Sequence, residues 1–263
     1  MWALVTGASS GIGRDMARYL YLSLGYNLII VARNEDKLLE LKQELESKLQ
    51  EKNKNINREI IVIKADLSYL ADINNIVEKT KNIDVDLLVN NAGFGVFGNF
   101  TTTNLEKEVN LINTNITAVH ILTKVFLNKM KSKNKGHILN VASIAGMEPG
   151  PLMAAYYASK TYVIRLSRAI NKELRKEKSN IKISILCPGP VDTNFNNVAN
   201  VVFKAPSMPS EKVAKYGIDK ALKGKLIIVP GFLNKCVRFF SKILPDAILE
   251  EVAYHIQRRK GQY

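Results

Sequence analysis

Short apolar runs alternate along this chain with longer amphipathic stretches. The runs predict buried parallel strands at 2–5, 27–31, 60–63, 86–89, 137–141, 181–187 and 226–229. The stretches between them predict helices near 12–24, 34–52, 69–82, 104–130, 155–178 and 210–223. This alternation predicts an α/β fold, a doubly wound seven-stranded parallel sheet with helices on both faces.

Two regions depart from the alternation. Residues 188–209 contain four prolines and predict a long loop, of which 190–209 form a lid over a substrate. Residues 230–263 predict a C-terminal extension with two short helices separated at Pro245. Because no linker or internal repeat divides the chain, we expect one domain spanning 1–263.

The composition suits a cytoplasmic globular protein. Hydrophobic residues make up 46% of the 263 positions. The chain enters its first predicted strand at once, which argues against a signal peptide, and no apolar run reaches the roughly 18–20 residues of a membrane span. Cys187 and Cys236 make no disulfide framework, which favours a reducing cytoplasm. The three histidines fall in no ligand spacing, so we expect no metal site.

The net charge of +14 indicates an anionic partner. Most of the basic residues are dispersed along helices that the pattern places toward solvent, and no nucleic-acid-binding motif is present. A small molecule that carries phosphate is therefore favoured over nucleic acid.

Tyr156 and Lys160 stand four residues apart in a predicted helix, so their side chains share one face. A nearby ammonium favours the phenolate and lowers the pKa of a tyrosine. A general acid or base works best when its pKa lies near the working pH. The pair is a candidate acid–base site, although chance also produces this spacing.

The segment 6–13, Thr-Gly-Ala-Ser-Ser-Gly-Ile-Gly, follows the first strand and opens the first helix. Glycines there let the backbone approach a ligand closely, and the backbone N–H groups of a helix N-terminus bind phosphate. Three glycines at this place favour a pyrophosphate site over an ordinary strand–helix turn.

Together, four motifs resemble those of the short-chain dehydrogenase/reductase family. They are the Gly-x-x-x-Gly-x-Gly turn, Asn90-Asn91-Ala92-Gly93, Ser143 and Tyr156-x-x-x-Lys160. The resemblance runs from Trp2 to about Val229, with the motifs in the expected order. It implies a Rossmann-type sheet and an oxidoreductase that moves hydride between a nicotinamide cofactor and a carbonyl or alcohol carbon.

The resemblance implies a role for each reacting residue. Tyr156 exchanges a proton with the substrate oxygen, Ser143 holds that oxygen, and Lys160 lowers the pKa of Tyr156 and bonds the nicotinamide ribose. Asn115 holds a water of the proton relay, although its neighbour Asn113 leaves the register open.

Tyr157 is the weaker candidate for the general acid–base of the two adjacent tyrosines. Four residues after it stands Thr161 rather than a lysine. We therefore expect Tyr156 to be the general acid–base.

The resemblance also implies a set of cofactor contacts, with Asp66 at the adenine, although an aspartate there commonly forms a turn or caps a helix. Asn91 and its neighbours lie beside the adenine-side ribose, and the segment from Pro188 to Thr193 lies over the nicotinamide. Cys187, next to that segment, is expected to be a buried strand residue. The set is Gly7, Ser9, Ser10, Gly11, Ile12, Gly13, Arg33, Asp66, Leu67, Asn91, Ala92, Gly93, Tyr156, Lys160, Pro188, Gly189, Val191 and Thr193.

Arg33 favours NADP(H) over NAD(H). An NAD enzyme usually carries an acid at the end of the second strand to bond the ribose 2′-hydroxyl, whereas a guanidinium suits a 2′-phosphate. One departure weakens this prediction, because Ser10 stands where many NADP-dependent members have a basic residue. Arg14 is close by but is also explained as a surface helix residue.

The loop 93–100 is rich in aromatic residues and glycine. Phe94, Val96 and Phe97 either line an apolar substrate mouth, with Val201, Val202, Phe203 and Met208 as its lid, or pack the loop into the core. The segment 225–231 resembles the last strand of members that reduce hydrophobic ketones, including 3-oxoacyl and hydroxysteroid-type enzymes.

The segment 235–244 is basic, aromatic and amphipathic. A helix that covers the substrate pocket or a subunit interface is favoured there over one that lies on an anionic membrane. Arg258-Arg259-Lys260 is expected to be a solvated tail.

The sequence thus predicts an NADP(H)-dependent reductase of hydrophobic ketones. The family commonly pairs subunits through helices 104–130 and 155–178, so we expect a homodimer or homotetramer. The competing hypotheses are a non-catalytic dinucleotide sensor or scaffold and a reductase bound to the membrane surface. Because all four reacting positions are present, the sequence favours an enzyme over a sensor.

Overall fold

A computed structural model describes residues 1–52, 57–193, 207–241 and 243–258. Its main sheet has seven parallel strands in the order β3-β2-β1-β4-β5-β6-β9. This confirms the predicted seven-stranded, Rossmann-type sheet. The strands are β1 (Trp2–Thr6), β2 (Asn27–Ala32), β3 (Ile60–Lys64), β4 (Val85–Asn90), β5 (His137–Val141), β6 (Lys182–Leu186) and β9 (Ile227–Ile228).

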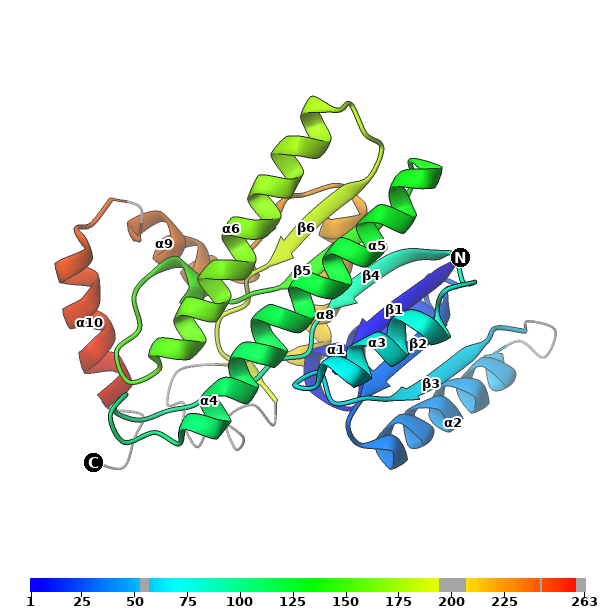
Figure 1. Ribbon diagram of the computed structural model, residues 1–263, viewed down its shortest axis with the longest axis horizontal. Coiled ribbons are helices and arrows are strands. Elements are labelled where there is room, and N and C mark those ends of the chain that lie inside the picture. The colour runs from blue at the N-terminus through cyan, green and yellow to red at the C-terminus, as the bar shows by residue number, and fades with distance from the viewer. Residues whose placement is uncertain (53–56, 194–206, 242, 259–263) are drawn as a thin grey trace.

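Helices cover both faces of the sheet. Helices α1, α2 and α8 pack on one face, and α3, α5 and α6 pack on the other; Figure 1 shows α5 and α6 crossing in front of β4, β5 and β6. The helices are α1 (Gly11–Leu22), α2 (Glu35–Lys52), α3 (Leu70–Lys79), α4 (Leu105–Ile112), α5 (Val119–Lys133), α6 (Ala154–Lys176), α8 (Ser210–Leu222), α9 (Phe232–Phe240) and α10 (Asp246–Arg258). Among the described residues, none of these helices combines the length and apolarity needed to cross a bilayer.

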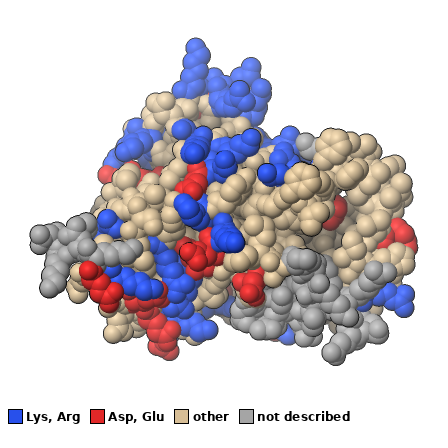
Figure 2. Space-filling model, turned by 180° about the vertical axis from the view of Figure 1, so that it is seen from behind, with Lys and Arg blue, Asp and Glu red and all other residues tan. Residues whose placement is uncertain are grey.

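Apart from Lys160, the basic side chains of the described residues are at least partly exposed. Figure 2 shows them gathered at the top, where α6 ends, and mixed with acidic side chains elsewhere. Arg175 and Lys176 occupy the last turn of α6, where cations interact favourably with the helix dipole. The basic residues at the end of α6 are therefore explained by the stability of that helix and do not by themselves indicate a binding site.

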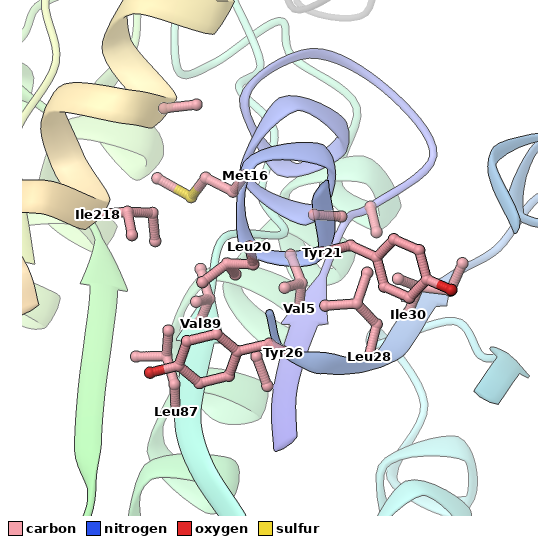
Figure 3. Close-up of a cluster of buried hydrophobic side chains, with 14 of the residues drawn as sticks. Val5, Met16, Leu20, Tyr21, Tyr26, Leu28, Ile30, Leu87, Val89 and Ile218 are labelled. Carbon is pink, nitrogen blue, oxygen red and sulfur yellow. The ribbon is translucent and has the colours of Figure 1, made fainter. Parts of the chain in front are cut away.

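The central strands are mostly apolar because both of their faces are buried. In β1, Val5 belongs to the core cluster beneath α1 and α8, whereas Leu4 belongs to the opposite cluster. Figure 3 shows Met16 and Leu20 of α1 and Ile218 of α8 packed above the strands. The carboxyl ends of the strands are thereby held together at one edge.

The predicted helix 104–130 is interrupted. A π-helical turn, η1 (Asn113–Ala118), separates α4 from α5 and buries Thr114, Asn115 and Ala118. The extra residue in the turn directs Asn115 inward. Such turns occur often at functional sites.

The long loop and the C-terminal extension also contain regular structure. Strand β7 (Val191–Asp192) pairs in parallel with β8 (Met208–Pro209), so part of the predicted loop is extended. The predicted lid residues Val201, Val202 and Phe203 lie outside the described residues. Helices α9 and α10 flank Pro245, as expected.

Candidate active site

The glycine turn between β1 and α1 tolerates no added side chain at its tightest point. Gly7 and Gly11 have φ angles of 67° and 53°, a region that favours glycine. A Cβ on Gly13 would lie 2.4 Å from the carbonyl oxygen of Gly7 and 2.3 Å from Nδ2 of Asn91. The turn therefore lies flat against the end of β4.

Asn91 and Thr6 fasten this turn to β4. Asn91 Nδ2 donates to the carbonyl oxygen of Thr6 at 2.9 Å. The Thr6 hydroxyl oxygen accepts from the backbone N–H groups of Asn91 at 3.0 Å and Ala92 at 3.1 Å. Asn91 thus positions the turn directly, a role that sequence reasoning did not assign to it.

The N-terminus of α1 suits a pyrophosphate. Its N-cap, Ser10, makes no side-chain capping bond, and the first turn carries no acid. The first N–H groups of a helix lack partners within the helix and attract anions. The glycine backbone and this helix end fit the phosphate groups of a dinucleotide.

Ser143 and Tyr156 meet beside the carboxyl end of β5. Ser143 caps the short 3₁₀ helix η2 (Ile144–Met147), where its hydroxyl oxygen accepts from the N–H of Ala145 at 3.1 Å. The same hydroxyl donates to the carbonyl oxygen of Pro188 at 3.3 Å. Burial raises the pKa of Tyr156 to about 12, against the effect of a hydrogen bond with Ser143. The two predicted hydroxyl groups are therefore together.

Lys160 lies one turn along α6 and is also buried. Its Nζ donates to the carbonyl oxygen of Val141 at 3.0 Å and lies 5.8 Å from the centroid of the Tyr156 ring. Burial lowers the pKa of Lys160 to about 8. The pair is adjacent as predicted, but the expected lowering of the Tyr156 pKa is not found, because burial of the phenol prevails.

The structure distinguishes between the two candidate asparagines. Asn115 is fully buried, whereas Asn113 is partly exposed. Asn115 Nδ2 donates to the carbonyl oxygen of Phe94 at 2.9 Å and to Ser159 Oγ at 3.0 Å, and its Oδ1 accepts from the N–H of Phe94 at 3.1 Å. Asn115 therefore joins α6 to the loop after β4, and its predicted role in a water relay stays a prediction.

Gly93 lies where this loop passes the reacting residues. A Cβ at Gly93 would lie 2.9 Å from Asn115 Oδ1 and 3.2 Å from Lys160 Nζ. The absence of a side chain lets these two groups approach the loop together.

Arg33 and Asp66 lie at the ends of β2 and β3. Their charged groups are 3.9 Å apart, and the Arg33 side chain is 66% exposed. Asp66 Oδ1 accepts from the N–H and hydroxyl of Ser68 at 2.9 and 2.8 Å. Asp66 therefore stabilises a turn, which was the alternative to an adenine contact. The adenine contact itself stays a prediction. Leu67 beside it is buried in the core.

Arg14 forms an ion pair on the surface of α1, which agrees with its interpretation as a surface helix residue rather than a cofactor contact. Its guanidinium lies 3.1 Å from Glu44. Arg18 and Lys48 also bind Glu44, and the hydrogen bond from Arg18 is the largest cause that lowers the pKa of Glu44 to about 2. Arg14 therefore belongs to a charged network between α1 and α2.

A cavity of about 480 Å³ begins at Arg33 and extends to α4. Its lining includes Phe94, Val96 and Phe97, and none of the four predicted catalytic residues. The same three side chains also pack against a cluster that contains Tyr156. The aromatic loop therefore both contributes to the core and faces a cavity.

The segment after β6 lies across the edge of the sheet. Thr193 is so close to the glycine turn that a Cβ on Gly11 would be 2.9 Å from its methyl carbon. On the other side, a Cβ on Gly189 would lie 2.3 Å from Asn234 of α9. Cys187 is buried, as expected, and burial raises its pKa to about 12.

Tyr157 is hydrogen-bonded to the C-terminal extension. Its hydroxyl accepts a hydrogen bond from Gln257 of α10, and burial raises its pKa. This geometry agrees with the preference for Tyr156.

Sequence reasoning missed a buried polar chain behind the site. Asn90 Nδ2 donates to Asn140 Oδ1 at 2.8 Å and to Thr123 Oγ1 at 3.0 Å, and Asn140 Nδ2 donates to Ser167 Oγ at 2.9 Å. The chain joins β4 and β5 to α5 and α6. Its signal in the sequence was Asn140 inside the apolar run 137–141 and Asn90 directly after the run 86–89.

Across the described ranges, no group of three or more His, Cys, Asp or Glu side chains is arranged to hold a metal ion.

Comparison with known proteins gives a consistent result. The family model of the short chain dehydrogenases matches residues 1–201. The 17-beta-hydroxysteroid dehydrogenase type 3 of Rattus norvegicus is 32% identical over 206 residues, which are 76% of this chain and 62% of that protein. The NADP-dependent 3-hydroxy acid dehydrogenase of Schizosaccharomyces pombe is 34% identical over 198 residues, 74% of this chain and 73% of that protein. This chain thus spans less than two thirds of the rat relative.

Two solved structures are similar over almost their whole length, and both are 25% identical. A short-chain dehydrogenase from Sphingobium yanoikuyae in complex with NADPH has a TM-score of 0.78 and covers 94% of this chain and 97% of its own. A short-chain dehydrogenase/reductase from Burkholderia phymatum in complex with NAD has a TM-score of 0.79 and covers 92% of each chain.

Proposed function

Because this chain belongs to the short-chain dehydrogenase family, we propose that it is an oxidoreductase that interconverts a hydrophobic ketone and its alcohol with NADP(H). The observation that carries the proposal is the convergence of Ser143, Tyr156 and Lys160 beside the end of β5. A bound nicotinamide would supply or accept the hydride.

The residues of the chain handle the proton in this proposal. The hydroxyl of Tyr156 gives its proton to the carbonyl oxygen during reduction and takes one back during oxidation. A pKa of about 12 keeps Tyr156 protonated at neutral pH, so a proton is present for donation to the carbonyl oxygen. Ser143 holds the same oxygen, and Asn115 links the site to a proton relay.

We infer a preference for NADP(H) from Arg33. Its exposed guanidinium stands at the end of β2, on the cavity that Asp66 also lines. A planar guanidinium can bind a 2′-phosphate with two hydrogen bonds. The relative from Schizosaccharomyces pombe is named NADP-dependent, while the two solved structures hold NADPH and NAD.

The substrate class follows from the apolar surroundings of Tyr156. Leu111, Met153 and Tyr157 lie in its cluster, and Phe94 and Phe97 pack against that cluster. Apolar surroundings of this kind favour an aliphatic or steroid-like ketone, such as a 3-oxoacyl compound, over a polar sugar.

We also infer the assembly and the compartment. Leu105, Val109 and Ile112 of α4 are 74%, 44% and 42% exposed, and burial of this face against a second subunit would form a homodimer or part of a homotetramer. Both cysteines are free, which agrees with a cytoplasmic location.

The Tyr156→Phe variant tests the reaction. General acid–base catalysis contributes roughly 10²–10⁴-fold, so we expect turnover in an NADPH-oxidation assay with hydrophobic ketones to fall by about that factor. NADPH binding, followed by fluorescence titration, should change little.

Tyr157→Phe is the matched control, because it removes the neighbouring buried hydroxyl from the same helix. Its turnover should stay within about threefold of the wild type. Equal turnover by Tyr156→Phe and the wild-type enzyme would refute the proposed mechanism and favour a non-catalytic dinucleotide sensor.

Arg33→Asp tests the cofactor. A charged hydrogen bond contributes about 1.5–3 kcal/mol, so the dissociation constant for NADPH should rise by at least about tenfold, while that for NADH stays equal or falls. A wild-type enzyme that binds NADH more tightly than NADPH would contradict the assignment.

A further inference from the structure

Helix α9 is amphipathic, but its apolar side faces outward. None of its residues is fully buried. Phe232, Leu233, Phe239 and Phe240 are 78%, 73%, 60% and 52% exposed. A helix that covers a pocket would bury this side, so the expected covering role does not account for these four side chains.

Helix α10, which follows α9 after a short connection, also exposes apolar side chains. It is anchored by one buried stripe, Leu249, Ala253 and Gln257, and the adjacent stripe remains exposed. Together the two helices and their connection form what we call the C-terminal apolar face: Phe232, Leu233, Phe239, Phe240, Ile243, Leu244, Ile248, Val252 and Ile256. Exposed apolar surfaces of this extent generally mark interaction sites.

The charge around this face differs between its two helices. From Phe232 to Pro245, along α9 and the connection, the sequence contains three basic residues and no acid. Lys235 is exposed on α9, whereas α10 carries Asp246, Glu250 and Glu251, of which Glu251 pairs with His255. In Figure 2 the right-hand side, which carries α9 and α10, is mostly uncharged.

We propose that the C-terminal apolar face binds the surface of an anionic lipid bilayer. Helices with exposed aromatic and aliphatic side chains beside basic residues lie in the interface between lipid headgroups and acyl chains. A second copy of the chain is the competing occupant of this face, and the measurement of oligomeric state described below distinguishes it from a bilayer.

The face also lies next to the proposed active site. Asn234 of α9 contacts Gly189, in the segment after β6, and Gln257 of α10 binds Tyr157 of the catalytic helix. A bilayer on this face would therefore lie beside the proposed active site. The binding itself does not depend on the proposed reaction.

Co-sedimentation of the full chain with vesicles tests the proposal. The vesicles contain phosphatidylcholine alone or a 3:1 mixture of phosphatidylcholine and phosphatidylglycerol. We expect the wild-type protein to bind the mixed vesicles, and 0.5 M NaCl to weaken the binding. Phe239→Ser/Phe240→Ser should lower the partition coefficient more than tenfold, and Lys235→Glu should lower it roughly tenfold on the mixed vesicles.

Leu39→Ser/Leu70→Ser is the matched control, because these side chains are 49% and 58% exposed and lie on α2 and α3 rather than on the C-terminal helices. It should bind like the wild type. The proposal is overturned if the wild type binds neither vesicle, or if the control loses as much binding as the α9 variants. It is also overturned if a wild-type dimer becomes monomeric in Phe239→Ser/Phe240→Ser by sedimentation velocity without any vesicle binding. If the double variant does not fold, Lys235→Glu alone still decides.

Discussion

The carboxyl edge of the sheet and the two C-terminal helices are neighbours, but they are built in opposite ways. At the edge, Asn115 and Ser143 are buried and bonded to other parts of the chain. On α9, by contrast, phenylalanine side chains are more than half exposed. The first region is specified by contacts within the chain, whereas the second is completed only by something outside it.

The largest effect is expected from a substitution at the tightest contact within the carboxyl edge of the sheet, between Gly13 and Gly7. In Gly13→Ala the added methyl group would lie 2.4 Å from the Gly7 carbonyl oxygen, so the turn must move. We expect the dissociation constant for NADPH to rise by about 100-fold or more, roughly 3 kcal/mol, in a fluorescence titration.

Gly25→Ala provides the control for that variant. Gly25 also has a positive φ, 78°, but a Cβ there would have no neighbour closer than 3.6 Å. It should cost about 1 kcal/mol of stability through backbone strain and leave NADPH affinity unchanged. Equal losses of affinity in both variants would show that the contact with Gly7 is not decisive.

His137 lies buried at the start of β5, away from the proposed active site, and is expected to affect stability rather than activity. His137 Nε2 lies 2.9 Å from Ser184 Oγ, and burial lowers the His137 pKa from 6.5 to about 4. The unfolded chain therefore takes up a proton first as the pH falls. The free energy of unfolding should decrease between pH 6.5 and 4 by roughly 3 kcal/mol from this group.

Urea denaturation of the wild type and His137→Gln across this range measures that contribution. Other groups contribute to both proteins, so the informative quantity is the difference between the two slopes. Parallel pH profiles would mean that His137 is not held in its neutral form by the fold.

The smallest effect is expected where the two regions touch. The hydrogen bond between Gln257 and Tyr157 ties α10 to α6. A double-mutant cycle with Tyr157→Phe and Gln257→Leu should give a coupling energy of about 1 kcal/mol in thermal or chemical unfolding. Additive effects would indicate that α10 is held by its apolar stripe alone.

The same contrast explains how far the sequence could be interpreted. Strands and helices followed from periodicity because each face of the sheet is buried, and the interruption at Asn113–Ala118 escaped because a π-helical turn adds one residue without changing the apolar pattern. The proximity of Tyr156 and Lys160 followed from their spacing. The pKa of Tyr156 did not, because burial depends on side chains from several distant elements.

Residues that bond across the fold were equally hidden. Asn91 binds Thr6, 85 positions earlier, and Gln257 binds Tyr157, 100 positions earlier. Neither contact leaves a local pattern. Only the three-dimensional structure brings these partners together.

The π-helical turn has a consequence for insertions and deletions. Removing one residue between Asn113 and Ala118 would restore a regular helix without shortening it by a full turn. Each residue of a regular helix advances about 100°, and the wide turn has already absorbed that advance for its extra residue, so α4 and α5 would keep their relative orientation while the residues of the turn change position. Asn115 would then lose its hydrogen bond with Phe94 or with Ser159. We therefore expect this helix to accept many substitutions on its exposed side and no change in length.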